Sequence, residues 1–185
     1  MYWRLPAALA LLTATMSLPA DQTDPRLNDL FEQLKDASDE TAASDTANAI
    51  WKIWFESRDP ESTKLLQEAV VAKQAGDYTL ALDTINKVLA RSPDFAEAWN
   101  QRAIIYYNVG YYDASLADVE QTLKLEPRHF GALSGRGMCY LGLKDAEEAL
   151  LAFEEALAVH PWLTAARMYA DSLREALELQ RRRGV

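Results

Sequence analysis

The sequence predicts an all-helical protein in which about three helix pairs stack into an α-solenoid, and three observations lead to this prediction. Pro93, Pro127 and Pro161 stand 34 residues apart, and the segments that they close align without a gap. Apolar residues in each segment recur with the period of a helix. A glycine turn divides each segment into two halves. A two-helix repeat cannot bury its apolar face alone, so neighbouring repeats are expected to stack.

Composition narrows the class of protein. The chain has 185 residues, 49% of them hydrophobic and 25% charged, which is typical of a folded domain rather than a disordered one. The formal net charge of -9 disfavours nucleic acid as a partner, because phosphate would be repelled. A single cysteine, Cys139, excludes a disulfide within the chain.

Residues 1–20 have the order of a secretory signal peptide. Arg4 gives a positive start, residues 5–18 carry no charge, and Ala20 precedes Asp21 as a small residue at the cleavage site. We therefore predict cleavage near Ala20, a secreted or periplasmic mature protein, and contact with the membrane only through the transient signal peptide. The alternative is that the segment is retained as an anchor.

Residues 21–61 are expected to form a helical hairpin, with helices over 26–37 and 41–57, that caps the N-terminal end of the stack. Trp51 and Trp54 lie at helical spacing in its second helix. These side chains could form an exposed patch for a partner. We favour packing of both against the helix that carries Leu65 and Leu66.

The repeats are predicted over 62–161, in units of 62–95, 96–129 and 130–161. Their eighth places hold small residues, which let two antiparallel helices approach closely: Ala69, Ala103 and Gly137. Glycine is expected to end each first helix, at Gly76, Gly110 and Gly142. Asp94 and Glu97 have the spacing of a capping box.

Residues 162–185 are expected to form one capping helix over 164–183. An apolar stripe runs along this segment, and Arg181, Arg182 and Arg183 would complement the negative end of the helix dipole.

Leu65, Trp99 and Leu133 at the fourth place, tyrosines at the eleventh and proline at the close resemble the tetratricopeptide-repeat family. The resemblance implies a right-handed α-solenoid. The seventh place departs from the family pattern, since Glu68, Arg102 and Arg136 replace the usual leucine. Within the family, residues 96–100 and 127–133 are similar to exported bacterial repeat proteins.

The family binds partners on its concave surface, which first-helix places 2, 5, 9, 12 and 13 line. Transferred to this chain, the resemblance implies a partner-binding groove that includes Lys73, Gln74, Asn100, Ile104, Tyr107, Asn108, Ser134 and Met138. The two asparagines suit a peptide backbone, because an amide both donates and accepts. Lys73 is the only cation among these places, so a clamp for a terminal carboxylate is not expected.

The sequence predicts no catalytic residue, metal site or cofactor. His129 and His160 stand at repeat junctions without metal-ligand spacing, and Cys139 lies within a packed helix with no basic residue four places before or after it. Gly131 and Gly135 interrupt a helix, which indicates the close approach of a backbone from another helix or from a ligand.

A scaffold or adaptor of the periplasm or cell envelope, which holds a protein or peptide partner in the groove, is therefore the favoured function. One alternative is a self-assembling structural protein, in which the C-terminal helix or the two tryptophans mediate a homo-oligomer. A small-ligand binder or an accessory subunit of an enzyme is a third.

Overall fold

The computed structural model describes residues 21–184, and the predicted signal peptide lies outside this range. Nine helices account for the described part of the chain. Their bounds are α1 Arg26–Lys35, α2 Glu40–Trp54, α3 Pro60–Gln74, α4 Tyr78–Arg91, α5 Ala96–Asn108, α6 Tyr112–Leu125, α7 Phe130–Gly142, α8 Ala146–Val159 and α9 Thr164–Arg183. Within residues 21–184 no helix combines the length and the apolar character needed to cross a bilayer.

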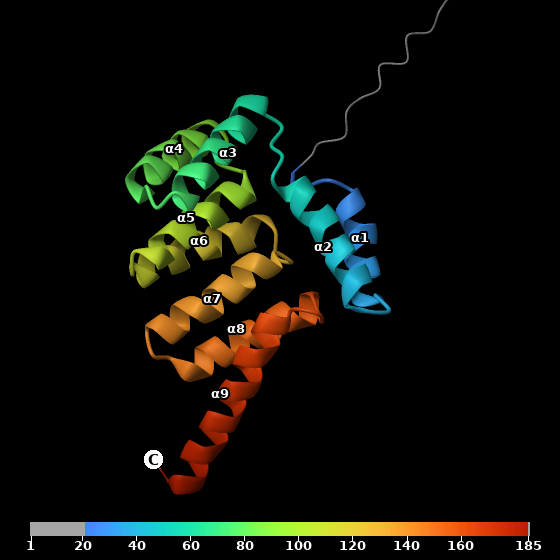
Figure 1. Ribbon diagram of the computed structural model, residues 1–185, viewed down its shortest axis with the longest axis vertical. Helices are drawn as coiled ribbons and strands as arrows, with labels where there is room; N and C mark the ends of the chain where they lie inside the picture. Colours follow the sequence, from blue (N-terminus) through green and yellow to red (C-terminus); the bar gives the residue numbers. More distant parts are fainter. Residues whose placement is uncertain (1–20, 185) are drawn as a thin grey trace, which may run out of the picture.

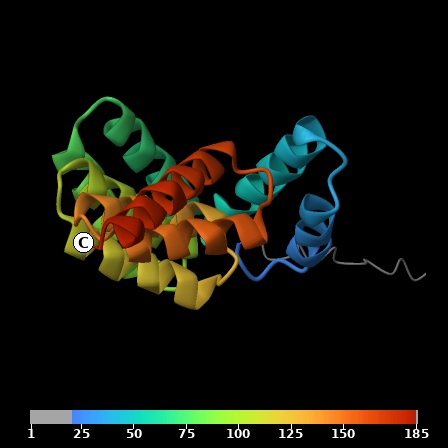
Figure 2. The ribbon, with the colours of Figure 1, turned by 90° about the horizontal axis from the view of Figure 1, so that it is seen from below.

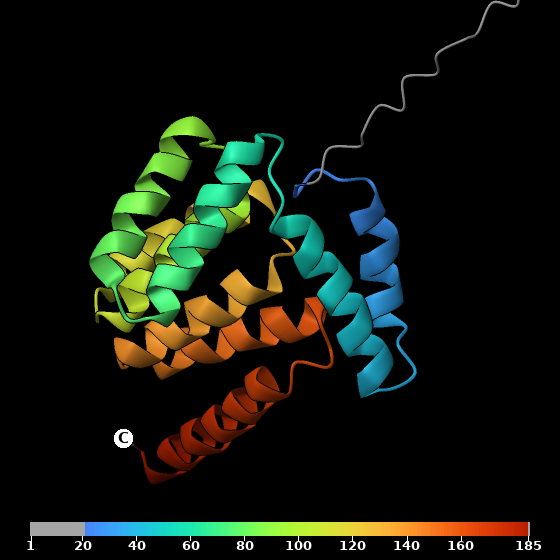
Figure 3. The same cartoon turned by 45° about the horizontal axis from the view of Figure 1, so that its top comes forward.

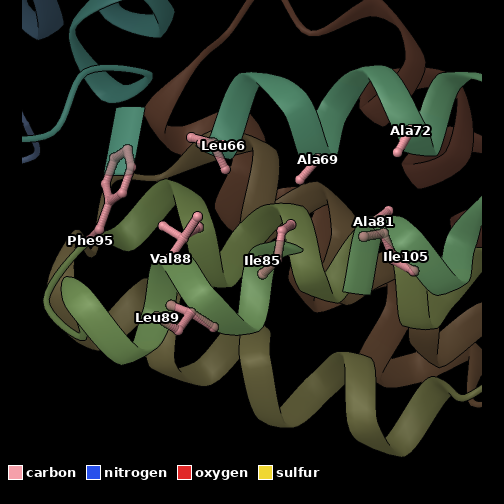
Figure 4. Close-up of a cluster of buried hydrophobic side chains, with 10 residues drawn as sticks. Leu66, Ala69, Ala72, Ala81, Ile85, Val88, Leu89, Phe95 and Ile105 are labelled. Atoms are coloured by element: carbon pink, nitrogen blue, oxygen red, sulfur yellow. The ribbon is translucent and has the colours of Figure 1, made fainter. Parts of the chain in front are cut away.

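Helices α3 to α8 form three consecutive pairs, which stack in chain order with α9 at the end (Figure 1). Each pair closes around small residues. Ala69 is fully buried and faces a cluster that includes Leu66 and Ile85 (Figure 4). In the third pair a Cβ atom at Gly137 would lie 2.8 Å from the Phe153 ring, so no larger residue fits there. The predicted all-helical solenoid is confirmed.

The turns inside the repeats require a left-handed backbone at one residue each. Gly76 and Gly110 supply it with φ of 80° and 82°, as predicted. The prediction for Gly142 is wrong, because this residue is still helical and Lys144 takes the left-handed conformation with φ of 64°. Gly142 has a different role: a Cβ atom there would lie 2.5 Å from the Tyr112 ring.

The arginines at the seventh place join neighbouring second helices. Arg102 forms a bidentate ion pair with Asp118 of α6 and also donates to Asn86 of α4. The Asp118 side chain is only 6% exposed. Arg136 pairs with Glu120 of α6 and Glu155 of α8 in the same way. The two arginines therefore replace apolar packing by ion pairs between helices, whereas Glu68 pairs with Lys64 within α3.

Both ends of the stack mix polar and apolar surface. The outward face of α3 exposes Lys64 and Glu68 together with Val71, which is 63% exposed. Helix α9 buries Ala166, Ala170 and Leu177 against the last pair. The rest of α9 is largely exposed and mixes polar with apolar residues. Met168 is 66% exposed and Leu179 44%, and Arg174 reaches back to pair with Glu154 of α8.

The N-terminal hairpin lies beside the stack instead of on top of it. Figures 1 and 3 show α1 and α2 alongside the repeat junctions, and the view from below in Figure 2 agrees. Its core includes Phe31, Ile50 and Trp54 together with Phe130 of α7. The expected N-terminal cap over Leu65 and Leu66 is therefore wrong. Trp54 packs instead on His129 and Trp51 on Phe130, at the junction of the second and third repeats.

Lys144 offers a test of the turn geometry. A residue with a Cβ atom is strained in the left-handed region, so Lys144→Gly relieves strain in the folded state. Glycine also gives the unfolded chain more conformational entropy, which opposes this gain, and the net effect should raise the free energy of unfolding by roughly 0.5 kcal/mol. The matched change Gly110→Ala should lower it by about 1 kcal/mol. Urea denaturation measures both. Two changes of the same sign would contradict the assignment of the turn.

Candidate functional site

The first helices of the repeats form the inner surface of the stack. Helix α3 contacts α5, and α5 contacts α7, whereas the second helices of neighbouring repeats are farther apart. A stack that is tighter on one side curves toward that side. The concave surface is therefore made by α3, α5 and α7, and the predicted groove residues all lie on these helices.

The groove residues differ in accessibility. Gln74 and Asn108 are exposed, and the others that reach the surface are half-buried: Lys73, Ile104, Tyr107, Ser134 and Met138. The Tyr107 ring lies 5.6 Å from that of Tyr112, and burial raises the pKa of its hydroxyl. Asn100 is only 2% exposed and donates to Glu97 over 3.1 Å. The expectation that Asn100 offers its amide to a peptide is therefore wrong.

Glu97 is the centre of a buried polar network. Its carboxylate is 1% exposed and accepts from the amide of Asn100, from the amide of Gln101 at 2.6 Å and from His129 Nε2 at 2.9 Å. The N-cap of α5 is Phe95, which has no side-chain cap, so the predicted capping box of Asp94 and Glu97 does not form. Glu97 points into the protein because three donors there replace the solvation of its charge.

Lys73 extends the network to the first repeat. Its ammonium donates to Gln101 Oε1 over 2.5 Å, which places Gln101 between the cation and the carboxylate of Glu97. Burial lowers the pKa of Lys73, and the nearby charge of Glu97 partly opposes this effect. The one cation among the predicted groove residues is therefore already committed to the protein itself.

His129 is neutral in this arrangement. Its Nδ1 accepts the backbone N–H of Ala132 over 3.0 Å, so the ring proton is on Nε2 and is donated to Glu97. Trp54 stacks on the ring with centroids 4.1 Å apart and an angle of 10°. The hairpin thus covers the network with an aromatic side chain.

Trp51 fits into a notch at Gly131. A Cβ atom there would lie 2.6 Å from the Trp51 ring, so glycine is required where α2 crosses α7. The close approach expected at Gly131 is thus made by a side chain rather than a backbone. The one expected at Gly135 is absent, because no atom lies within 4 Å of a Cβ placed there.

The hairpin consequently divides the inner surface. Helix α2 covers the N-terminal end of α7, where Trp51 contacts Gly131, and its Trp54 covers His129, which donates to the buried Glu97 of α5. The later groove residues of α5 and α7 are half-buried or exposed. The sequence carries one signal of this burial. Glu97, Asn100 and Gln101 follow the i, i+3, i+4 spacing of a single helix face, and a polar stripe of this kind can be buried as well as solvated.

Cys139 is buried and hydrogen-bonded within the protein. The Cys139 thiol donates to Ser115, and burial raises its pKa. Within residues 21–184 no three of the His, Cys, Asp and Glu side chains gather as metal ligands do. What the surface offers is a set of apolar and amide side chains at fixed intervals, which suits the binding of a chain segment.

The geometry defines a helical-repeat protein with a partly covered inner surface, and the comparisons name its family. The tetratricopeptide repeat profile matches residues 66–108 and 100–161. A TPR repeat-containing protein of Rhizobium etli is 37% identical over 152 residues, which are 82% of this chain and 74% of that protein. The chain belongs to the tetratricopeptide-repeat family.

Solved structures agree on the fold. The Sgt2 TPR domain of Aspergillus fumigatus is similar with a TM-score of 0.63 and 23% identity, over 67% of this chain and 83% of that one. The first TPR of Spaghetti (RPAP3), bound to the HSP90 peptide SRMEEVD, has a TM-score of 0.61 and 22% identity, over 63% and 93%.

Removing the central carboxylate tests the network. In Glu97→Ala the amides of Asn100 and Gln101 and the His129 N–H lose their acceptor, which should lower the free energy of unfolding by about 3 kcal/mol. Urea denaturation measures this loss. The exposed Glu61→Ala is the control and should change stability by no more than about 0.5 kcal/mol. In a double-mutant cycle Glu97→Ala and His129→Ala should be non-additive by about 1 kcal/mol, and additivity would contradict the contact.

His160 predicts a dependence of stability on pH. Its Nδ1 is buried without a partner in the described residues, and burial lowers its pKa below the usual 6.5. A base with a lowered pKa stabilises the fold above its unfolded pKa and loses this contribution as the pH falls through the folded value. The free energy of unfolding should therefore fall between about pH 7 and pH 5.

The measurement is urea denaturation across this range for the wild type and for His160→Gln. The free energy of unfolding of the variant should decline less as the pH falls, because every other titratable group is common to the two proteins. Equal slopes would show that His160 does not titrate in this way.

Proposed function

We propose that this protein is an exported, non-enzymatic scaffold that binds a segment of another protein on the open part of its inner surface. The observation that carries the proposal is a row of half-buried apolar residues on α3, α5 and α7, one at the ninth place of each repeat. This row consists of Val70, Ile104 and Met138. It lies beyond the part that the hairpin covers, although Met138 also packs against the core between α8 and α9.

The side chains around this row define what it can hold. Tyr107 and the amides of Gln74 and Asn108 lie one helical turn further along the first helices. Apolar contacts from the row and hydrogen bonds from the amides suit a neutral segment, extended or helical, with apolar residues at regular intervals.

The charges argue against an acidic terminus as the ligand. Lys73 is bonded to Gln101 and lies near the buried charge of Glu97. A terminal carboxylate would need further cations, which the predicted groove residues do not supply. This chain is thus proposed to differ in ligand from the TPR structure solved with the HSP90 peptide SRMEEVD, although the two share a fold.

Export is proposed from residues 1–20 alone, through their charged start, apolar stretch and small residue before Asp21. A periplasmic or envelope location follows from this segment. The absence of a catalytic role is proposed from the buried, hydrogen-bonded Cys139 and from the lack of a nucleophile with a base on the inner surface.

A comparison of co-purifying proteins tests the function. The double variant Ile104→Ser/Met138→Ser removes two apolar side chains from the row, so recovery of a groove-bound partner should fall at least about tenfold by quantitative mass spectrometry. The control Val71→Ser/Leu151→Ser removes apolar side chains that are 63% and 52% exposed elsewhere on the surface, and it should leave recovery unchanged. Addition of the peptide SRMEEVD should not displace the partner.

Equal recovery of every protein with wild type and with the groove variant would show that the inner surface is not the binding site. Displacement by the acidic peptide would show that the proposed ligand chemistry is wrong.

A further inference from the structure

A second surface of the protein combines exposed apolar residues with unpaired negative charge. The turns inside the three repeats, residues 74–80, 108–114 and 142–148, lie next to one another along one edge of the stack (Figures 1 and 3). We call this the turn edge. It is the edge away from the N-terminal hairpin, so nothing in the described chain covers it.

The turn edge holds a concentration of exposed apolar side chains. Leu80 is 52% exposed, Tyr111 65% and Leu143 42%, and Val109 stands at the same place of its repeat as Leu143. Single exposed apolar residues are ordinary, but these four lie in adjacent turns at one edge of the stack, and we call them the strip.

The strip is surrounded by carboxylates. Five exposed acidic residues lie within the turn edge: Asp77, Asp113, Asp145, Glu147 and Glu148. Lys144 is the one cation of these three turns. None of the five has an ion-pair partner among residues 21–184, whereas Glu120, Glu154 and Glu155 on the outer faces of the second helices each pair with an arginine.

Unpaired like charges around an apolar strip repel one another, and a partner of opposite charge relieves this repulsion while it covers the strip. An anionic membrane or a nucleic acid has the wrong charge for such a surface. We propose that the turn edge docks a cationic amphipathic segment of a partner protein, with apolar side chains on Tyr111 and Leu143 and lysine or arginine opposite the carboxylates. The turn edge meets the groove at Gln74 and Asn108, but the carboxylates and apolar residues of this contact are not groove residues, so the proposal does not depend on the groove's function.

The test uses a labelled amphipathic peptide with one leucine face and one lysine face, and a counterpart in which glutamate replaces lysine. Fluorescence anisotropy with the full mature chain should show saturable binding of the lysine peptide only. The affinity should fall several-fold between about 0.1 M and 0.5 M salt, because exposed ion pairs are screened.

Neutral variants then locate the site. Asp113→Asn/Glu147→Gln/Glu148→Gln leaves the helix caps Asp77 and Asp145 intact and should weaken the lysine peptide about tenfold. Asp29→Asn/Glu32→Gln/Asp45→Asn makes the same change in net charge on the exposed face of the hairpin and should have little effect. Tyr111→Ser/Leu143→Ser should weaken binding without altering its salt dependence. The groove variant Ile104→Ser/Met138→Ser should bind the lysine peptide as the wild type does.

Equal weakening by the two neutral triples would show that net charge alone attracts the peptide, and the proposal would be overturned. Light scattering on the chain alone gives the other decisive result. If the wild type is an oligomer and the turn-edge triple is a monomer, the occupant is a second copy, whose Arg181, Arg182 and Arg183 would supply the positive charge, and the proposed partner is wrong.

Discussion

The arrangement of this protein depends on one buried carboxylate. Glu97 is removed from water, and a charge in that position is stable only when donors surround it. Asn100 and Gln101 come from its own helix, and His129 comes from the next repeat, so the carboxylate ties two repeats together. Because His129 is also the surface on which Trp54 stacks, the same interaction fixes the place of the hairpin.

The position of the hairpin in turn decides which part of the inner surface a partner can reach. Helix α2 covers His129 and the start of α7, and Trp51 fills the notch at Gly131. The later places stay accessible, with an apolar row flanked by amides. A repeat stack without this hairpin would present its whole inner surface. Here the chain occupies part of that surface itself, which limits a partner to a shorter contact.

The repeating part of the fold could be predicted from the sequence because stacking leaves a periodic record. Small residues at the eighth place, prolines at the close and the helix over 164–183 follow from packing rules that act locally. The position of the hairpin could not be predicted in this way. Its contacts Phe130 and His129 lie far away in the chain, and the apolar pattern of α2 would fit any apolar face of the right size.

The roles of polar residues are harder to predict from the sequence, because they also depend on residues from distant helices. An acidic residue in the first turn of a helix serves a cap or a buried network equally well, and only the donors from other helices distinguish the two for Glu97. Lys144 shows the same limit: the glycine at 142 indicated a turn, but the ring of Tyr112 explains that glycine, and the left-handed residue lies two places later. The groove residues follow from the family resemblance, which does not account for Asn100, because its amide donates to the buried carboxylate of Glu97 instead of reaching the surface.

Hydrogen exchange of the hairpin tests the central claim most directly. If α2 is fixed on the Glu97–His129 network, the amides of α2 should exchange as slowly as those of α5 and α7. All three helices would then exchange through the same global unfolding. Amides of α2 that exchange orders of magnitude faster, while α5 and α7 stay protected, would contradict the account. The hairpin would then be a separate, mobile unit, and the inner surface would be open along its whole length.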